Sequence, residues 1–381
     1  MITFSMSDEQ QAMYDTIHSF AKDEMRPLLR TCEEKEGLPE ELEKKYHEMG
    51  LTTLDIPQEF GGQGLDSVTA AIVSEELAWG DVGMAMSFPG PGLTGYAIWE
   101  LGTKEQKERY LPLFSQPDGY KRRGALALTE PDTGSAIRSL STKAELQGRD
   151  YVLKGKKCMI TNAGRADIYV VCAATGEGKS QRTAAFVVEK GTPGLVMGKK
   201  DEKLGLITAP SGEVILENCR VPRENMLGGE EDTKAGIDRF LTRARITHAA
   251  RTVGMARASF EYALNYSKER VAFGKPIAQH QVIAFMLADM ATEIDAARLL
   301  TWKAAWLLDK GQPAQTEASM ALVQATEMAT RVTIDAVQIL AGHGYIQDHP
   351  VEKWMRDART MAMVVGTTQV QNIIIGRGIS A

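Results

Sequence analysis

The 381-residue sequence has only four cysteines, and none of them forms a CxxC pair or a cluster with histidine. Zinc sites and disulfide frameworks depend on such spacings. We therefore expect no metal site. We interpret Cys32, Cys158, Cys172 and Cys219 as free thiols in a reducing compartment.

The sequence also lacks long basic and long apolar runs. The net charge is −6, and the short cluster KRR at 121–123 is typical of a solvated loop, so nucleic acid is not an expected partner. No window approaches the ~20 apolar residues that a membrane helix needs. The N-terminal segment has neither the basic start nor the apolar block of a signal peptide. These absences predict a cytoplasmic protein without a membrane span.

A third absence concerns nucleotide binding, because no strand pattern is followed by GxGxxG. A dinucleotide or flavin must therefore be held in another way. The segment DIPQEFGGQGLD (55–66) is interpreted as a loop, since its proline and paired glycines interrupt regular structure.

The residue pattern changes twice along the chain. Residues 1–120 carry apolar positions at three- and four-residue steps, which predicts a helical domain. Residues 121–230 hold short β-branched runs between Gly, Asn and Pro, which predicts a small antiparallel β domain. Residues 231–381 predict an antiparallel four-helix bundle with helices near 234–269, 281–310, 314–341 and 350–379. This segregation of helices and strands favours an α+β fold over a doubly wound sheet.

Small residues within LALTEPDTGS (126–135) would allow a flat cofactor to approach the backbone closely. Further along, Arg270 and Gln281 in ERVAFGKPIAQHQ (269–281) are suited to hold a pyrophosphate by charge-assisted hydrogen bonds. Each motif also has a purely structural explanation: a β-turn at 131–132, surface side chains at Arg270 and Gln281, and a helix C-cap in AGHG (341–344).

Five such motifs occur in a characteristic order over nearly the whole chain. The other three are MIT (159–161), QILAGHGYIQDHPVEKWMRDAR (338–359) and GTTQVQ (366–371). Together they resemble the acyl-CoA dehydrogenase family. The resemblance implies an FAD-dependent enzyme acting on the CH–CH group of an acyl-CoA thioester. It also implies a homotetramer, built as a dimer of dimers, that exchanges electrons with electron-transfer flavoprotein.

The resemblance also assigns residues to the two ligands. It implies that 269–281 reaches the FAD of a neighbouring subunit and that Gln338 to Gly342 hold its adenosine end. The residues expected at FAD are Leu126, Leu128, Thr129, Gly134, Ser135, Met159, Ile160, Thr161, Arg270, Phe273, His280, Gln281, Gln338, Gly342, Thr367 and Gln369. Those expected at the acyl-CoA are Ser135, Thr242, Arg245, Arg251 and Gly366.

The catalytic glutamate of the family is missing. Most members place it directly before the glycine of the GT-x-Q motif, where this chain has Val365. Others place it before an arginine on the long helix, where this chain has Ala244 before Arg245. Neither apolar side chain can accept a proton from the α-carbon of a thioester. A carboxylate suits that step because burial raises its pKa toward the working pH.

Three readings of this loss stay open. In the first, His248 replaces the glutamate, since it lies four residues after Ala244 on one helix face and its pKa should be lowered by Arg245 and Arg251. A purely structural histidine fits the same pattern. In the second, the enzyme is a lyase or desulfinase that needs no α-proton base, although 80–92 lacks the arginine expected of the desulfinases. In the third, the chain is a non-catalytic FAD-binding subunit of a hetero-oligomer.

Arg251 is unusual for a greasy acyl tunnel. It follows His248 by one turn, and a short polar or anionic acyl group would explain it. An arginine at a subunit contact fits equally well.

Overall fold

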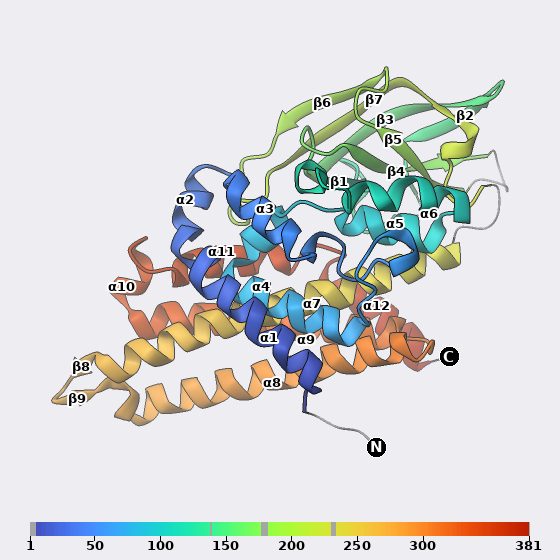
Figure 1. The fold of residues 1–381 in the computed structure, drawn as a ribbon. Helices are drawn as coiled ribbons and strands as arrows, with labels where there is room; N and C mark the ends of the chain where they lie inside the picture. Colours follow the sequence, from blue (N-terminus) through green and yellow to red (C-terminus); the bar gives the residue numbers. More distant parts are fainter. Residues whose placement is uncertain (1–4, 138, 177–181, 230–233, 381) are drawn as a thin grey trace.

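The computed structural model describes residues 5–137, 139–176, 182–229 and 234–380. Helices precede and follow a central group of strands, as expected for the α+β class (Figure 1). The first helices have clear start signals: Ser7 and Thr103 each form a capping box with the glutamine three residues later. They are α1 (Asp8–Phe20), α2 (Leu29–Glu34), α3 (Glu40–Glu48), α4 (Ser67–Ser87), α5 (Gly92–Leu101) and α6 (Lys104–Tyr110).

The β domain is a mixed sheet, which corrects the expectation of a purely antiparallel one. β1 runs parallel to β4, and β2 makes a single parallel pair with β4, whereas the other pairs are antiparallel. Two strands, β2 and β6, were not predicted, because both are largely exposed and charged. The strands are β1 (Gly124–Ala127), β2 (Lys143–Gln147), β3 (Asp150–Thr161), β4 (Ile168–Thr175), β5 (Arg182–Glu189), β6 (Leu195–Lys200) and β7 (Ser211–Pro222).

The C-terminal part differs from prediction at its last helix. The segment 350–379 is not one helix, because Val365 and Gly366 have positive φ angles of 60° and 100°. A right-handed helix cannot continue through such residues, and Thr367 starts a new helix as its N-cap. The helices are α7 (Lys234–Glu269), α8 (Gln281–Asp309), α9 (Gln315–Leu340), α10 (Gly342–Tyr345), α11 (Val351–Met361) and α12 (Thr368–Ile379); β8 (Val271–Ala272) and β9 (Lys275–Pro276) form a hairpin between α7 and α8.

The helices from the two ends of the sequence share one hydrophobic core. Side chains of α1, α3 and α4 pack together with side chains of α7, α8, α9 and α11. Gly254 makes the close approach of α7 to α4 possible, because a Cβ atom there would lie 2.0 Å from the Glu75 carbonyl oxygen.

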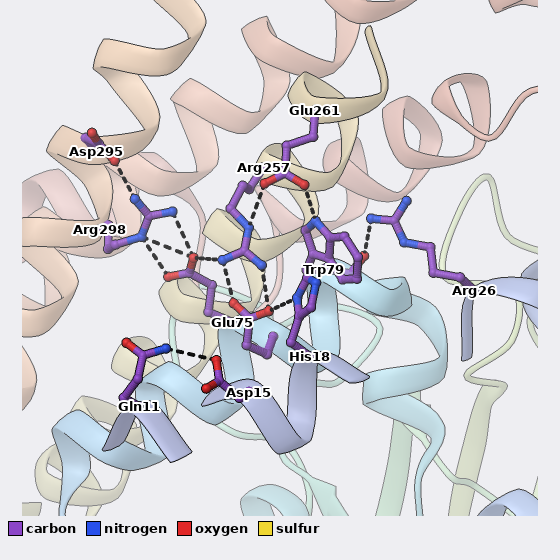
Figure 2. Close-up of polar contacts among 11 residues, drawn as sticks. Gln11, Asp15, His18, Arg26, Glu75, Trp79, Arg257, Glu261, Asp295 and Arg298 are labelled. Carbon is purple, nitrogen blue, oxygen red and sulfur yellow. Dashed lines mark hydrogen bonds and ion pairs between the residues drawn. The ribbon is translucent and has the colours of Figure 1, made fainter. Parts of the chain in front are cut away.

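A buried polar network fixes α7 against α4 and α8 (Figure 2). Arg257 of α7 donates to Glu75 at 2.9 Å and to Glu76 at 2.7 Å. Arg298 of α8 also bonds Glu75, and His18 of α1 bonds Glu76 at 2.9 Å. Because each carboxylate has more than one partner, the network holds four helices in a fixed arrangement.

A second buried cluster holds α11, which leads into the loop at 362–367. Lys353 donates to Asp81 at 2.6 Å and to Asp357 at 2.8 Å, and all three side chains are fully buried. Asp81 sits at a kink in α4, where its backbone leaves the helical region. Asp357 also accepts a hydrogen bond from the Leu206 amide, so this cluster connects all three parts of the chain.

Candidate active site

The end of β1 exposes one side of its backbone and side chains. Leu126, Leu128 and Thr129 are half-buried, while Ala125 and Ala127 between them are buried. This alternation follows from the pleat of a strand. One face therefore remains open for a ligand to cover.

A buried ion pair fixes the chain just beyond β1. Lys157 donates to the Leu128 carbonyl at 3.0 Å and to Glu130 at 2.8 Å. Burial alone would raise the pKa of Glu130, but hydrogen bonds from Lys157, Ser141 and Thr142 outweigh burial and hold that pKa at about 2. The carboxylate therefore stays ionised and keeps the segment in place.

Met159 protrudes beside this segment. A bulge between Lys157 and Ile160 interrupts the β3–β7 pairing, Met159 has a φ of 56°, and its side chain is 63% exposed. Its neighbour Cys158 donates to the Thr129 carbonyl at 3.0 Å, which brings the bulge next to the end of β1. An exposed apolar side chain in a strained backbone is typical of a binding surface. Thr161 is half-buried and Ile160 is buried.

The start of α7 meets this surface through an apolar cluster. Ala244 is buried in it, and Leu126, Leu128 and Val365 pack against it. The fold therefore brings both positions that lack the glutamate next to the end of β1. Thr242 is buried two residues earlier and donates to the Asp238 carbonyl at 2.7 Å.

Arg245 is a buried cation that lacks hydrogen-bond acceptors for some of its donors among the described residues. It is 4% exposed, and its Nε and Nη1 atoms have no hydrogen-bond partner in the described part of the chain. Burial lowers the pKa of its guanidinium to about 10. Unpaired buried donors are costly, so this side chain is well suited to bind a polar ligand group.

His248 is 3% exposed, and its Nε2 lies 3.0 Å from the Met361 carbonyl oxygen at the end of α11. Nε2 must therefore donate, which leaves the Nδ1 lone pair of a neutral ring available. Burial is the main cause that lowers the pKa of His248 to about 4, the Met361 carbonyl opposes this shift, and Arg251 adds to it. Arg251 thus acts in the expected direction, while Arg245 is not among the causes of the shift.

The loop at 362–367 is strained at the position of the missing glutamate. Val365 is a β-branched residue with positive φ, a rare conformation that marks functional loops. The Gln371 amide donates to the carbonyls of Val365 and Gly366 at 3.0 and 3.1 Å and so holds the loop. Thr367 is half-buried and Gln369 is exposed.

The residues expected at FAD from the β8–β9 hairpin and from the end of α9 do not lie beside β1 of the same chain. The hairpin β8–β9 lies at the end of the long helices, away from the sheet (Figure 1). There Phe273 is 97% exposed with a φ of 51°, Arg270 and Gln281 are exposed, and His280 contacts the Ala272 carbonyl at 3.1 Å. Gln338, near the end of α9, and Gly342 are exposed as well. The C-cap residue of α9 is Ala341, with a φ of 51°, not a glycine.

Comparison with known proteins identifies this arrangement. Three family models match in order: the acyl-CoA dehydrogenase N-terminal domain at residues 7–116, the middle domain at 125–219 and the C-terminal domain at 236–380. The chain belongs to the acyl-CoA dehydrogenase family. Members of this family are FAD-dependent oxidoreductases, and the predicted fold class is confirmed.

Individual relatives of this acyl-CoA dehydrogenase cover it almost completely. An acyl-CoA dehydrogenase of Bacillus subtilis is 39% identical over 98% of both chains. The structure of butyryl-CoA dehydrogenase from Megasphaera elsdenii has a TM-score of 0.94 and 36% identity and covers 100% of both chains. A chain from the structure described as the electron transferring flavoprotein of Acidaminococcus fermentans has a TM-score of 0.92 and 37% identity and covers 99% of both chains.

The acyl-CoA dehydrogenase residues fit FAD on structural grounds. The open strand face and the exposed Met159 leave room for a flat cofactor, whereas the Arg245 donors, which lack partners among the described residues, are available to a second ligand. Within the described ranges, no helix has the length and apolar character of a membrane span, and no three potential metal ligands cluster. All four cysteines are free.

Sequence reasoning missed three polar residues near α7. Tyr96 of α5 bonds the Thr247 hydroxyl at 2.9 Å, and Asp55 bonds Tyr96. Burial is the main cause that raises the pKa of Asp55, and burial likewise raises the pKa of Tyr46 of α3. The positive charge of Arg251 acts in the opposite direction and lowers the pKa values of Asp55, Tyr46 and Tyr96. Asp55 falls in a segment interpreted only as a loop, and no sequence signal linked it to α7.

Proposed function

We propose that this acyl-CoA dehydrogenase catalyses α,β-dehydrogenation of an acyl-CoA thioester, or the reverse reaction, with a base other than the family's glutamate. One observation carries the proposal. A single apolar cluster joins the end of β1, Ala244 and Val365, and the same turn of α7 carries Arg245, whose Nε and Nη1 donors have no partner among the described residues. This arrangement suits a thioester enclosed beside a flat cofactor.

FAD, when bound, supplies the acceptor for the β-hydride. The open face at Leu126, Leu128 and Thr129, with Gly134 and Ser135 beyond it and Met159 to Thr161 beside it, would hold the flavin. The exposed hairpin with Arg270 and Phe273, together with Gln338 and Gly342, would complete the site from a neighbouring subunit, and Thr367 and Gln369 would also contact the cofactor. The exposure of Phe273 supports this assignment. We propose the oligomer that the family resemblance implies, a homotetramer built as a dimer of dimers.

The protein groups have separate roles at the thioester. Arg245 would donate hydrogen bonds to the CoA portion, and Thr242, Ser135 and Gly366 would line the channel. The apolar side chains of Ala244 and Val365 exclude water. His248 is the proposed base, because its ring is neutral at pH 7 and Nδ1 retains a lone pair when Nε2 donates to Met361.

The second candidate is a reaction without an α-proton base, such as elimination by a lyase or desulfinase. The pKa of His248 supports this candidate, since a value of about 4 makes the imidazole a weak proton acceptor. A non-catalytic FAD-binding subunit is a third candidate, and the two apolar positions suit it equally. Product analysis separates these candidates.

Electron-transfer flavoprotein is the proposed redox partner. The high similarity to a chain from a structure of such a flavoprotein supports the assignment. Four free cysteines fit a reducing compartment such as the cytoplasm.

The test is anaerobic mixing of the FAD-loaded protein with a panel of CoA thioesters. Bleaching of the flavin absorbance together with an α,β-unsaturated product would support dehydrogenation. Bleaching by none of the saturated thioesters, with release of another group from a substituted one, would favour the second candidate. If no thioester perturbs or bleaches the flavin, neither activity holds.

A further inference from the structure

Arg251 occupies the far end of the α7 face that carries the proposed site. Ala244, His248 and Arg251 are separated by four and then three residues, which places them on one side of the helix. With a rise of 1.5 Å per residue, Arg251 lies about 10 Å along the axis from Ala244. Long helical side chains lean toward the helix N-terminus, so the guanidinium leans back toward the thioester end of the site.

The charge of Arg251 has no counter-ion among the residues that the structure describes. No carboxylate there lies within 4.0 Å of its guanidinium. Three other arginines of α7 are paired, since Arg239 and Arg243 bond Glu100 and Arg257 bonds Glu75. Asp55 is the nearby acid, but burial raises its pKa and so disfavours the ionised form that would neutralise Arg251.

A tyrosine hydroxyl near Arg251 also has no hydrogen-bond partner among the described residues. Tyr46 is 6% exposed, and its ring stacks on Phe88 with centroids 4.0 Å apart. Its hydroxyl makes no hydrogen bond to any residue in the described ranges. The charge of Arg251 lowers the pKa values of this hydroxyl and of Tyr96, Asp55 and His248, so it acts on groups of α3, α5, the 55–66 loop and α7. A hydroxyl donor and a cation that both lack partners among the described residues favour an anionic ligand group.

We propose that Arg251 and Tyr46 form the distal end of the acyl site and bind the terminal carboxylate of a short dicarboxylic acid monothioester. This inference rests on the proposed function. The carboxylate would accept N–H bonds from the guanidinium and an O–H bond from Tyr46, both of which fit its acceptor-only character. The spacing between Ala244 and Arg251 limits the acyl chain to about four to six carbons.

The test compares two thioesters that differ only at the end of a five-carbon chain: glutaryl-CoA with a carboxylate and pentanoyl-CoA with a methyl group. Binding to the FAD-loaded enzyme is followed by flavin spectral perturbation and by calorimetry. The wild type should bind glutaryl-CoA at least about 10-fold more tightly, and Arg251→Gln should weaken that binding about 10- to 100-fold with little change for pentanoyl-CoA. Tyr46→Phe should cause a smaller loss of about 3- to 10-fold.

Two further variants keep the result interpretable. Arg239→Gln removes a paired, exposed arginine of the same helix and should leave the preference unchanged. Arg251→Lys preserves the charge and should retain part of the preference, even if the glutamine variant folds poorly.

Three outcomes would overturn the inference. They are equal wild-type affinity for both thioesters, equal loss for both in Arg251→Gln, and a changed oligomeric state of Arg251→Gln on size exclusion, which would assign Arg251 to a subunit contact. Failure to bind glutaryl-CoA would also overturn it, whereas failure of the whole panel of CoA thioesters would refute the proposed function itself.

Discussion

Val365→Glu tests whether the site is a conventional one that has lost its base. Val365 packs against the cluster that includes Ala244, Leu126 and Leu128, so a carboxyl group at this position would be partly desolvated and its pKa raised toward neutrality. The backbone should tolerate the change, because the Gln371 amide holds the loop through carbonyl groups and glutamate is less restricted at positive φ than valine. General base catalysis is worth ~10²–10⁴-fold.

We therefore expect Val365→Glu to accelerate flavin reduction by butyryl-CoA by up to this factor over the wild type. The assay is anaerobic stopped-flow reduction at saturating thioester. Val365→Gln is the matched control, since it has the same size and no basic group. Equal rates for the two variants would refute the reasoning. Fast turnover of butyryl-CoA by the wild type would show that a competent base is already present.

Four further predictions follow from the packing and the charges. His248→Gln keeps hydrogen bonding but removes the base, so flavin reduction by the true substrate should collapse while ligand binding survives; rates within a few-fold of wild type would exclude His248 as the base. Arg270→Ala should weaken FAD binding by about 1.5–3 kcal/mol if the hairpin contacts the cofactor, which titration of apoprotein with FAD checks against an unchanged affinity. Gly254→Ala forces a methyl group against α4 and should destabilise the protein by about 1–3 kcal/mol, whereas Gly376→Ala, with open space around it, should be neutral or stabilising in the same thermal melts. The folded-state pKa of Glu130 is about 2, below its ordinary 4.5. Its contribution of about 3 kcal/mol to the free energy of unfolding is therefore present above pH ~4.5 and is lost as the pH falls through about 2. Glu130→Gln should lower the denaturation midpoint at pH 7, and a difference that persisted unchanged at pH 2 would contradict the assignment.

Sequence reasoning located the long helices well, because their apolar periodicity extends over many turns. α7 begins and ends as predicted, α8 ends one residue early, and α9 differs by one residue at each end. The break between α11 and α12 was missed because it depends on the positive φ of Val365, a residue with no such preference of its own. The parallel pairing of β1 with β4 was missed because residue patterns reveal strands but not their partners.

Sequence motifs likewise predicted some residues of the site and missed others. Motif order placed Leu126, Met159, Ala244 and Val365 in one family framework, and the fold gathers these segments into one region. The groups around Arg251 could not be predicted, since Tyr46 and Asp55 come from segments about 200 residues away in the chain. Their proximity depends on how the N-terminal helices pack on α7, which no local pattern encodes.

The core shared by the two ends of the chain constrains how the protein folds during synthesis. The apolar surface of α4 has its main partner in α7, which is made only after about 150–180 more residues. At ~5–20 residues per second, a ribosome needs on the order of 10–40 s to produce them. During that interval the nascent N-terminal helices expose surface that nothing yet covers. We expect early release or pausing before α7 to leave an aggregation-prone fragment, and chaperone binding to concentrate on this stage of translation.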